Sequence, residues 1–129
     1  MGALRHYYDF AVAYEDLLSA PNVRPAHAPI MIDESLKSAV WTFARQAGDQ
    51  TIVHLINIAR PDVDEWRDPQ ANYPQPPSLR NVRISVGKNW HSAFVASPDD
   101  GLGTPEPVPI KDGFIVVPRL DYWSMIVLR

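Results

Sequence analysis

The apolar residues at the start of the chain recur at the spacing of a helix. Positions three or four apart carry Leu4, Tyr7, Ala11, Tyr14 and Leu18. This spacing gathers the side chains on one helix face, which we expect to be buried. Pro21 ends the segment, because proline disfavours helical geometry in the residue before it. The pattern predicts one helix within residues 1–20 and an irregular connector over residues 21–35.

From Leu36 onward the apolar period changes to two, which is typical of strands. The stretch "AVWTFARQ" alternates, "GDQ" favours a turn, and "TIVHLINIA" is apolar on both faces, as in the middle of a sandwich. Asp112-Gly113 favours a further hairpin within "VPIKDGFIVV". Turns separate about seven or eight such short strands, which is the pattern of an antiparallel sandwich. The sequence therefore predicts an all-β domain over residues 36–129, preceded by the helix.

Two of these strands contain an interruption. "LRNVRISV" alternates with one slip, where we expect a β-bulge. Pro118 is expected to end its strand, because proline has no backbone N–H to donate. The final stretch "LDYWSMIVL" then supplies the last strand.

Composition narrows the classes of function. The chain has 129 residues, of which 46% are hydrophobic, and a net charge of -3. This mild acidity gives no basic surface for nucleic acid, and the apolar runs are too short to span a membrane. The first residues lack the uninterrupted apolar region of a signal peptide, so none is expected. The absence of cysteine excludes disulfides and thiolate metal sites.

Acidic residues cluster in the proline-rich loop at 60–78, which contains Asp62, Asp64, Glu65 and Asp68. Glycoside hydrolysis needs two carboxylates at a defined separation, whereas adjacent carboxylates in a loop usually lie in water. A Ca²⁺ site is an alternative, although the glycine of an EF-hand loop is missing. The four histidines have no metal-binding spacing, and His54 is expected to be a hydrogen-bonded core residue. We therefore expect no catalytic residue, no metal site and no cofactor in this chain.

Aromatic residues are the better candidates for contact with a ligand. Sugar rings stack on exposed aromatic faces, and neighbouring carboxylates can bind their hydroxyl groups. The predicted carbohydrate-binding residues are Trp66, Asp68 and Tyr73 in the loop, and Trp90 at the start of a strand. We favour the competing interpretation for Trp66, that it packs the loop onto the sandwich or onto a neighbouring domain, because a large aromatic side chain usually gains more from burial. The aromatic residues within strands, Trp41, Tyr122 and Trp123, are expected in the core or on a sheet face.

Three segments carry a family resemblance. They are "YYDFAVAYEDLL" (residues 7–18), "TIVHLINIARPDVDEWRD" (residues 51–68) and "FIVVPRLDYWSMIVL" (residues 114–128). In this order they resemble the C-terminal part of glycoside hydrolase family 66, which contains dextranases and cycloisomaltooligosaccharide glucanotransferases. The resemblance implies that residues 3–18 correspond to the last helix of a catalytic β/α barrel, and residues 36–129 to a Greek-key β-sandwich.

The resemblance also implies what the chain does. In this family the barrel carries an Asp nucleophile and a Glu acid/base, and no position here matches their motifs. The expected function is a non-catalytic C-terminal accessory domain of an enzyme acting on α-1,6-glucan such as dextran. The alternative is a carbohydrate-binding module that recognises α-glucan through loop aromatics, and an autonomous enzyme is the least supported interpretation.

The expected partners follow from the same division. They are the catalytic barrel of a parent enzyme, or a second copy of the chain through the helix, with α-glucan as a further candidate. If the apolar helix face stayed in water, the fold would lose roughly 1.5–3 kcal/mol of stabilisation for each large side chain. The helix must therefore fold back on the sandwich, pair with a second copy of the chain or fray. A parent enzyme acting on polymeric glucan would work outside the cell.

Overall fold

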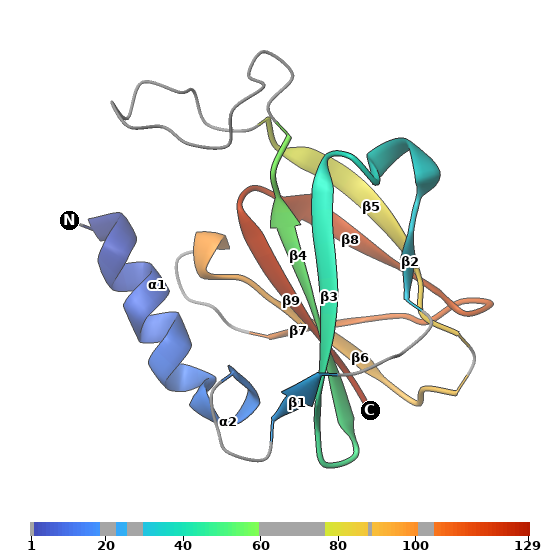
Figure 1. The fold of residues 1–129 in the computed structure, drawn as a ribbon, viewed down its shortest axis with the longest axis horizontal. Helices are drawn as coiled ribbons and strands as arrows, with labels where there is room; N and C mark the ends of the chain where they lie inside the picture. Colours follow the sequence, from blue (N-terminus) through green and yellow to red (C-terminus); the bar gives the residue numbers. More distant parts are fainter. Residues whose placement is uncertain (1, 19–22, 26–29, 60–76, 88, 101–104) are drawn as a thin grey trace.

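The chain folds into two antiparallel β-sheets, with a helical segment packed on one of them (Figure 1). The computed structural model describes residues 2–18, 23–25, 30–59, 77–87, 89–100 and 105–129. All strand pairs among these residues are antiparallel. The predicted all-β sandwich is confirmed.

The larger sheet contains six strands in the order β1-β3-β4-β9-β6-β7. Its strands are β1 (Arg24–Pro25), β3 (Val40–Ala47), β4 (Gln50–Asn57), β9 (Trp123–Leu128), β6 (Ala93–Ala96) and β7 (Glu106–Val108). Gly48, with φ at +63°, allows the tight turn of the hairpin between β3 and β4. The last strand, β9, lies between this hairpin and β6, so the sheet depends on the long-range pairing typical of Greek-key folds.

The smaller sheet contains three strands in the order β2-β5-β8. These are β2 (Met31–Ile32), β5 (Leu79–Ser85) and β8 (Phe114–Leu120). Two short 3₁₀ helices, η1 (Glu34–Leu36) and η2 (Pro98–Asp100), accompany the sheets. Within the stretch predicted as a connector, β1 and β2 each add two residues to a sheet, and Ile32 is buried against the main core.

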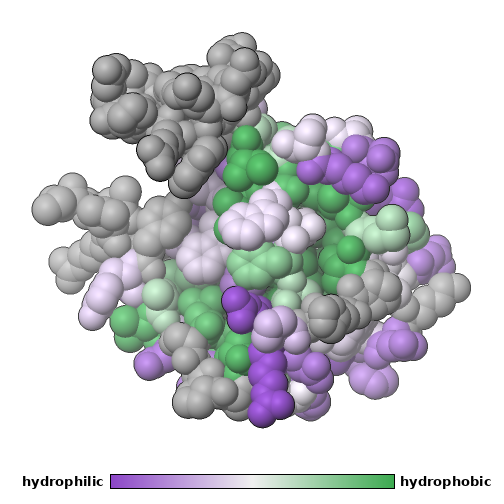
Figure 2. All heavy atoms as spheres, viewed as in Figure 1, coloured by the Kyte–Doolittle hydropathy of each residue, from purple (hydrophilic) through white to green (hydrophobic). Residues whose placement is uncertain are grey.

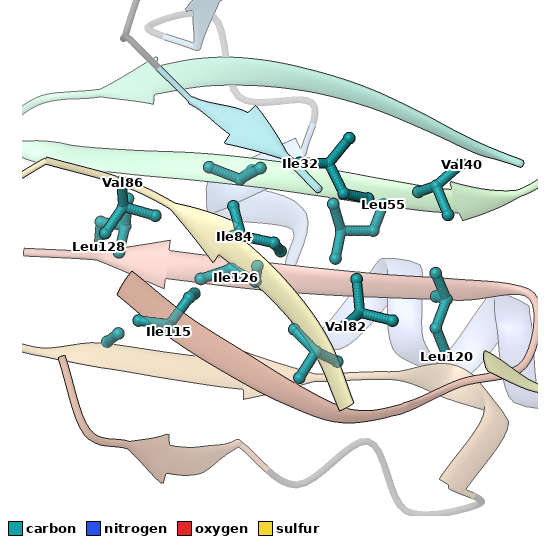
Figure 3. Close-up of a cluster of buried hydrophobic side chains, with 13 residues drawn as sticks. Ile32, Val40, Leu55, Val82, Ile84, Val86, Ile115, Leu120, Ile126 and Leu128 are labelled. Carbon is teal, nitrogen blue, oxygen red and sulfur yellow. The ribbon is translucent and has the colours of Figure 1, made fainter. Parts of the chain in front are cut away.

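The main core lies between the two sheets and is filled by alternate residues of their central strands (Figure 3). The side chains that β4 and β9 contribute are Val53, Leu55, Ile126 and Leu128, and those from β5 and β8 are Val82, Ile84, Ile115, Val117 and Leu120. Each large aliphatic side chain that is removed from water contributes about 1.5–3 kcal/mol. The period-two pattern therefore places a continuous apolar layer between the sheets.

The helical segment covers part of the opposite, outer face of the larger sheet. It consists of α1 (Gly2–Ala13) and α2 (Glu15–Leu18), with Tyr14 between them in place of the single predicted helix. Phe10 from α1 joins a second buried cluster, whose other members are Ala47, Ile52, Ala96, Met125 and Val127. The segment thus folds back on the sandwich, which is one of the three outcomes expected for its apolar side. It also explains why β4 is apolar on both faces.

The buried face of the helix differs from the predicted one. Phe10 is buried, whereas the predicted Ala11 is exposed, and Tyr14 and Leu18 are partly buried as expected. A phenylalanine removes more apolar area from water than an alanine, so the helix turns Phe10 to the sheet. The predicted Leu4 and Tyr7 have side chains outside the described set.

Two strand predictions were wrong in detail. β8 runs through Pro118 to Leu120. It is the last strand in its sheet, and at position 118 the backbone faces away from β5, so the missing N–H costs no ladder bond. The slip in the alternation of β5 is not a β-bulge. Arg80 pairs with Arg119 and Val82 pairs with Val117, so each strand has one residue between these two pairs and neither strand contains an extra one. The irregular residue is Asn81, whose φ of +53° lies in the left-handed region.

Candidate functional site

Six aromatic rings form a row across the outer face of the larger sheet. In order they are Tyr14, Phe10, Trp123, His54, Phe43 and Trp41, with successive ring centroids 4.7, 4.9, 5.8, 4.7 and 5.0 Å apart. Phe43 and His54 are paired directly across β3 and β4, so their side chains share a face and touch. This set of residues, the aromatic row, joins the helical segment to β9, β4 and β3.

His54 is the buried centre of the aromatic row and is only 4% exposed. Its Nδ1 accepts a hydrogen bond of 3.1 Å from Nε1 of Trp123, and its ring stacks on Phe43 at an interplanar angle of 18°. Burial, together with the nearby charge of Arg45, lowers the pKa of His54 to about 4. The ring is therefore neutral at physiological pH, and the prediction of a hydrogen-bonded core histidine is confirmed.

The far end of the aromatic row is open to solvent. Trp41 is 56% exposed, and Ile58, at the end of β4, is 49% exposed. Phe43 and Ile56 lie beside them and are partly buried. We call these four residues the Trp41 patch. Figure 2 shows pale aromatic and green apolar atoms gathered over β3 and β4 on this side of the molecule.

Asn57 holds three segments together at the end of β4. Its Nδ2 donates to the carbonyls of Pro77 and Asp121 at 2.8 Å each, and to that of Leu120 at 3.4 Å. Its Oδ1 accepts from the N–H of Ala59 at 3.0 Å. Asn57 is buried, so these bonds replace the water that its amide has lost. The asparagine of the "LIN" segment is a structural clamp.

Ser97 and Asp99 fix the backbone where β9 begins. Oδ2 of Asp99 accepts from the N–H groups of Tyr122 and Trp123, both at 2.9 Å. Oγ of Ser97 donates to the carbonyl of Trp123 at 2.6 Å and accepts from the N–H of Asp99 at 3.1 Å. The two side chains hold Trp123 at its place in the aromatic row.

A second carboxylate, Asp121, lies in the turn between β8 and β9. Its Oδ1 accepts from Nε of Arg119 at 2.9 Å and from the hydroxyl of Ser78. Burial raises the pKa of Asp121, but the hydrogen bonds from Ser78 and Arg119 and the arginine charges outweigh it, so the pKa lies below its usual value. Asp121 is ionised at neutral pH and unsuited to the role of a general acid.

The structure describes one of the four predicted carbohydrate-binding residues. Trp90 is partly buried against the main core, and its Nε1 donates to the carbonyl of Val86 at 2.7 Å. Contact of Trp90 with a sugar stays a prediction. Trp66, Asp68 and Tyr73 lie outside the described residues, as do the other acidic residues of their loop.

Sequence reasoning assigned no role to the exposed end of the aromatic row. The strand pattern correctly places Trp41 on a sheet face with Phe43 and Arg45. The presence of Arg45 on that face was the available signal that part of it meets solvent. Trp41 is the most exposed aromatic residue that the structure describes within a strand.

Other classes of site find no support in the described part of the chain. No group of three or more His, Asp or Glu residues there is arranged to hold a metal ion. Every buried side-chain nitrogen or oxygen among the described residues has a hydrogen-bond partner. No helix in the described ranges is long and apolar enough to cross a membrane.

Comparison with known proteins shows relatives that are much longer than this chain. Two cycloisomaltooligosaccharide glucanotransferases of Niallia circulans are 26% and 27% identical to it over 146 aligned residues. Each alignment covers 98% of this chain but 15% of the relative. The chain therefore corresponds to a small part of these proteins.

Solved structures give the same picture. A cycloisomaltooligosaccharide glucanotransferase of Paenibacillus sp., in complex with cycloisomaltoheptaose, superposes with a TM-score of 0.80 at 25% identity. The match covers 98% of this chain and 20% of that one. The α-L-fucosidase isoenzyme 2 of Paenibacillus thiaminolyticus has a TM-score of 0.51 at 17% identity, covering 78% of this chain and 15% of its own, and shares the fold alone.

The family model for "Glycosyl hydrolase family 66" matches residues 2–127, nearly the whole chain. This match spans both the helical segment and the two sheets, in agreement with the resemblance carried by the three sequence segments. The sandwich, its packed helix and the aromatic row between them are thus features of a chain that belongs to glycosyl hydrolase family 66.

Proposed function

We propose that this chain is a non-catalytic accessory domain of an enzyme that acts on α-1,6-glucan. The observation that carries the proposal is the coverage of the match: 98% of this chain aligns with 15% of each glucanotransferase. The sequence resemblance implies that the catalytic Asp and Glu of the family belong to a barrel, and no position of this chain matches their motifs.

The use of polar side chains supports a structural role. Glycoside hydrolysis requires two carboxylates that flank the sugar, about 5–10 Å apart. Asp99 accepts bonds from two backbone N–H groups, and Asp121 is bonded to Arg119 and Ser78. These carboxylates stabilise the backbone around β9, which is what a supporting domain needs from them.

The outward side of the helical segment supports contact with further protein. Tyr8 is 69% exposed and Val12 is 55% exposed, and residues four apart lie on one helix face. Phe10, on the opposite side, is buried on the sheet. A helix with apolar side chains on two sides can be packed between two layers, here the sandwich and a barrel.

A glucan polymer would be met outside the cell, so we propose that the parent enzyme works there.

Binding of glucan by this chain is the second candidate function, through Trp66, Asp68, Tyr73 and Trp90. Titration calorimetry of the purified chain with isomaltooligosaccharides, together with a dextran degradation assay, tests both functions. We expect neither heat of binding nor release of sugar. Binding that is lost in Trp66→Ala, while Trp41→Ala still binds, would favour the binding module. Dextran degradation would contradict a non-catalytic role altogether.

A further inference from the structure

The Trp41 patch is an apolar surface that the helical segment leaves uncovered. The helix packs on Ile52, Met125 and Val127, farther along the same face of the larger sheet. Trp41 and Ile58 remain about half exposed in the described structure. Solvent contact with adjacent large apolar side chains is unfavourable, and such groups commonly mark a contact surface. The surface is continuous with the buried part of the face, through the aromatic row.

The chemistry of the patch fits a protein surface better than a sugar. Ile56 is the direct cross-strand neighbour of Trp41, and the ring centroids of Phe43 and Trp41 lie 5.0 Å apart. Among these side chains only the indole of Trp41 carries a hydrogen-bonding group. Ligand sites combine apolar surface with several converging polar groups, which a sugar needs for its hydroxyls. The Trp41 patch lacks them, so a dry apolar partner is favoured.

The size of the patch selects among protein partners. Stable interfaces between separate molecules take about 20 residues on each side. Four residues are too few for a second copy of the chain to bind through this surface alone. A covalently linked domain has an effective concentration in the millimolar range, so a small apolar contact suffices. Relatives in which the matching part makes up 15–20% of a longer chain contain such a linked partner.

We propose that the Trp41 patch docks on the remaining part of a longer family 66 chain, with Trp41 as the anchor of the contact. The inference rests on the proposed accessory role and adds the surface through which that role is exerted. Large aromatic side chains dominate the energy of protein contacts when they are buried at the centre. Docking would bury the open end of the aromatic row and leave the outward side of α1 as a second contact.

The test grafts residues 2–127 into the Paenibacillus glucanotransferase in place of its matching segment. Hydroxyl-radical oxidation, read residue by residue by mass spectrometry, is compared between the graft and the isolated 129-residue chain. We expect oxidation of Trp41 to fall several-fold in the graft. Met31, which is 58% exposed on β2 of the smaller sheet, is the internal control and should be oxidised equally in both.

A substitution gives the second measurement. Trp41→Gln should lower the melting temperature of the graft by several degrees more than that of the isolated chain, where only the contact of Trp41 with Phe43 is lost. Val116→Gln, at an exposed position on β8, is the matched control and should have equal effects in both contexts. Equal effects of Trp41→Gln in both contexts would overturn the proposal, as would a graft in which Trp41 is oxidised as fast as in the isolated chain.

Two other possible occupants of the Trp41 patch, a second copy of the chain and a sugar, are tested on the isolated chain. A dimer in sedimentation analysis that Trp41→Gln dissociates would assign the patch to a second copy. Binding of isomaltooligosaccharides that Trp41→Gln abolishes would assign it to sugar. Either result overturns the docking proposal. The non-catalytic role itself fails only if the chain degrades dextran, which neither of these results at Trp41 involves, so the two failures are distinguishable.

Discussion

Trp123 and His54 are joined across β9 and β4 by a hydrogen bond of 3.1 Å between the indole Nε1 and the imidazole Nδ1. The donor is the indole, so Nδ1 must be unprotonated and the neutral ring carries its proton on Nε2. Protonation of Nδ1 would set two donors against each other in a buried site. The fold therefore favours the neutral form of His54, in the same direction as its lowered pKa.

Acid should destabilise the chain through His54. Its pKa is about 4 in the folded protein, compared with an ordinary value of 6.5. Between these values the unfolded chain binds more protons, so the free energy of unfolding rises with pH from about 4 to about 6.5 and is fully present above that. The difference should amount to roughly 3 kcal/mol. Urea denaturation at a series of pH values measures it.

The control for this prediction is His54→Phe, which should remove most of the pH dependence between these two values. Asp121 also has a lowered pKa, but its contribution is lost only as the pH falls below its ordinary value of 3.8, which separates the two effects. An unchanged pH dependence in His54→Phe would show that another group is responsible.

Removal of the Asn57 amide should weaken the junction of β4 with the turn between β8 and β9. Asn57→Ala deprives the carbonyls of Pro77 and Asp121 of their donor, and the N–H of Ala59 of its acceptor. We expect a loss of about 2–4 kcal/mol in the free energy of unfolding, measured by urea denaturation. Asn89→Ala, at an exposed position, is the matched control and should change it by less than about 0.5 kcal/mol. Equal effects would contradict the clamp.

Truncation of Phe10 should release the helical segment from the sheet. Phe10→Ala removes the ring that contacts Trp123 at 4.9 Å, and should cost about 3 kcal/mol. Far-ultraviolet circular dichroism should show a loss of helix, and the tryptophan emission of the chain should shift to longer wavelength as water reaches Trp123. Tyr8→Ala, on the exposed side of the same helix, should leave both signals unchanged. Retention of helix and emission in Phe10→Ala would mean that Phe10 does not hold the segment.

Substitutions of Asn81 should follow its backbone angle. At a φ of +53°, glycine is unstrained, whereas a β-branched residue is strained by about 1–2 kcal/mol. Asn81→Gly should therefore melt close to the unchanged protein, and Asn81→Val should melt several degrees lower. Because valine has a higher strand propensity than asparagine, a stabilising effect of Asn81→Val would contradict the left-handed conformation.

The strands of the sandwich could be predicted because their information is local. Alternation in "AVWTFARQ" and the turns at Gly48 and Asp112-Gly113 are read within a few residues of each other. The two-residue strands β1 and β2 are too short to have a period. The tolerance of Pro118 depends on the position of β8 at the end of a sheet, which is a property of the tertiary fold.

The candidate site was less accessible to sequence reasoning. Alternation places Trp41 on a face, but whether that face is covered depends on where the helix packs. The burial of Phe10 in place of Ala11 is likewise decided by contact with β9. The loop residues Trp66, Asp68 and Tyr73 stay predictions. The family resemblance was confirmed because it rests on whole segments whose order the longer relatives share.

The proline in β8 has a consequence for how the molecule behaves at high concentration. The N–H of Val86 donates to the carbonyl of Gly113, so the backbone at position 113 faces β5. Backbone polar groups point to opposite sides at successive residues of a strand, so those of residue 118 point away from β5. An incoming strand from another molecule would meet Pro118, which offers no N–H, in the middle of that edge. Edge-to-edge association, the first step towards amyloid-like aggregates, is thereby disfavoured without any charged residue at that position.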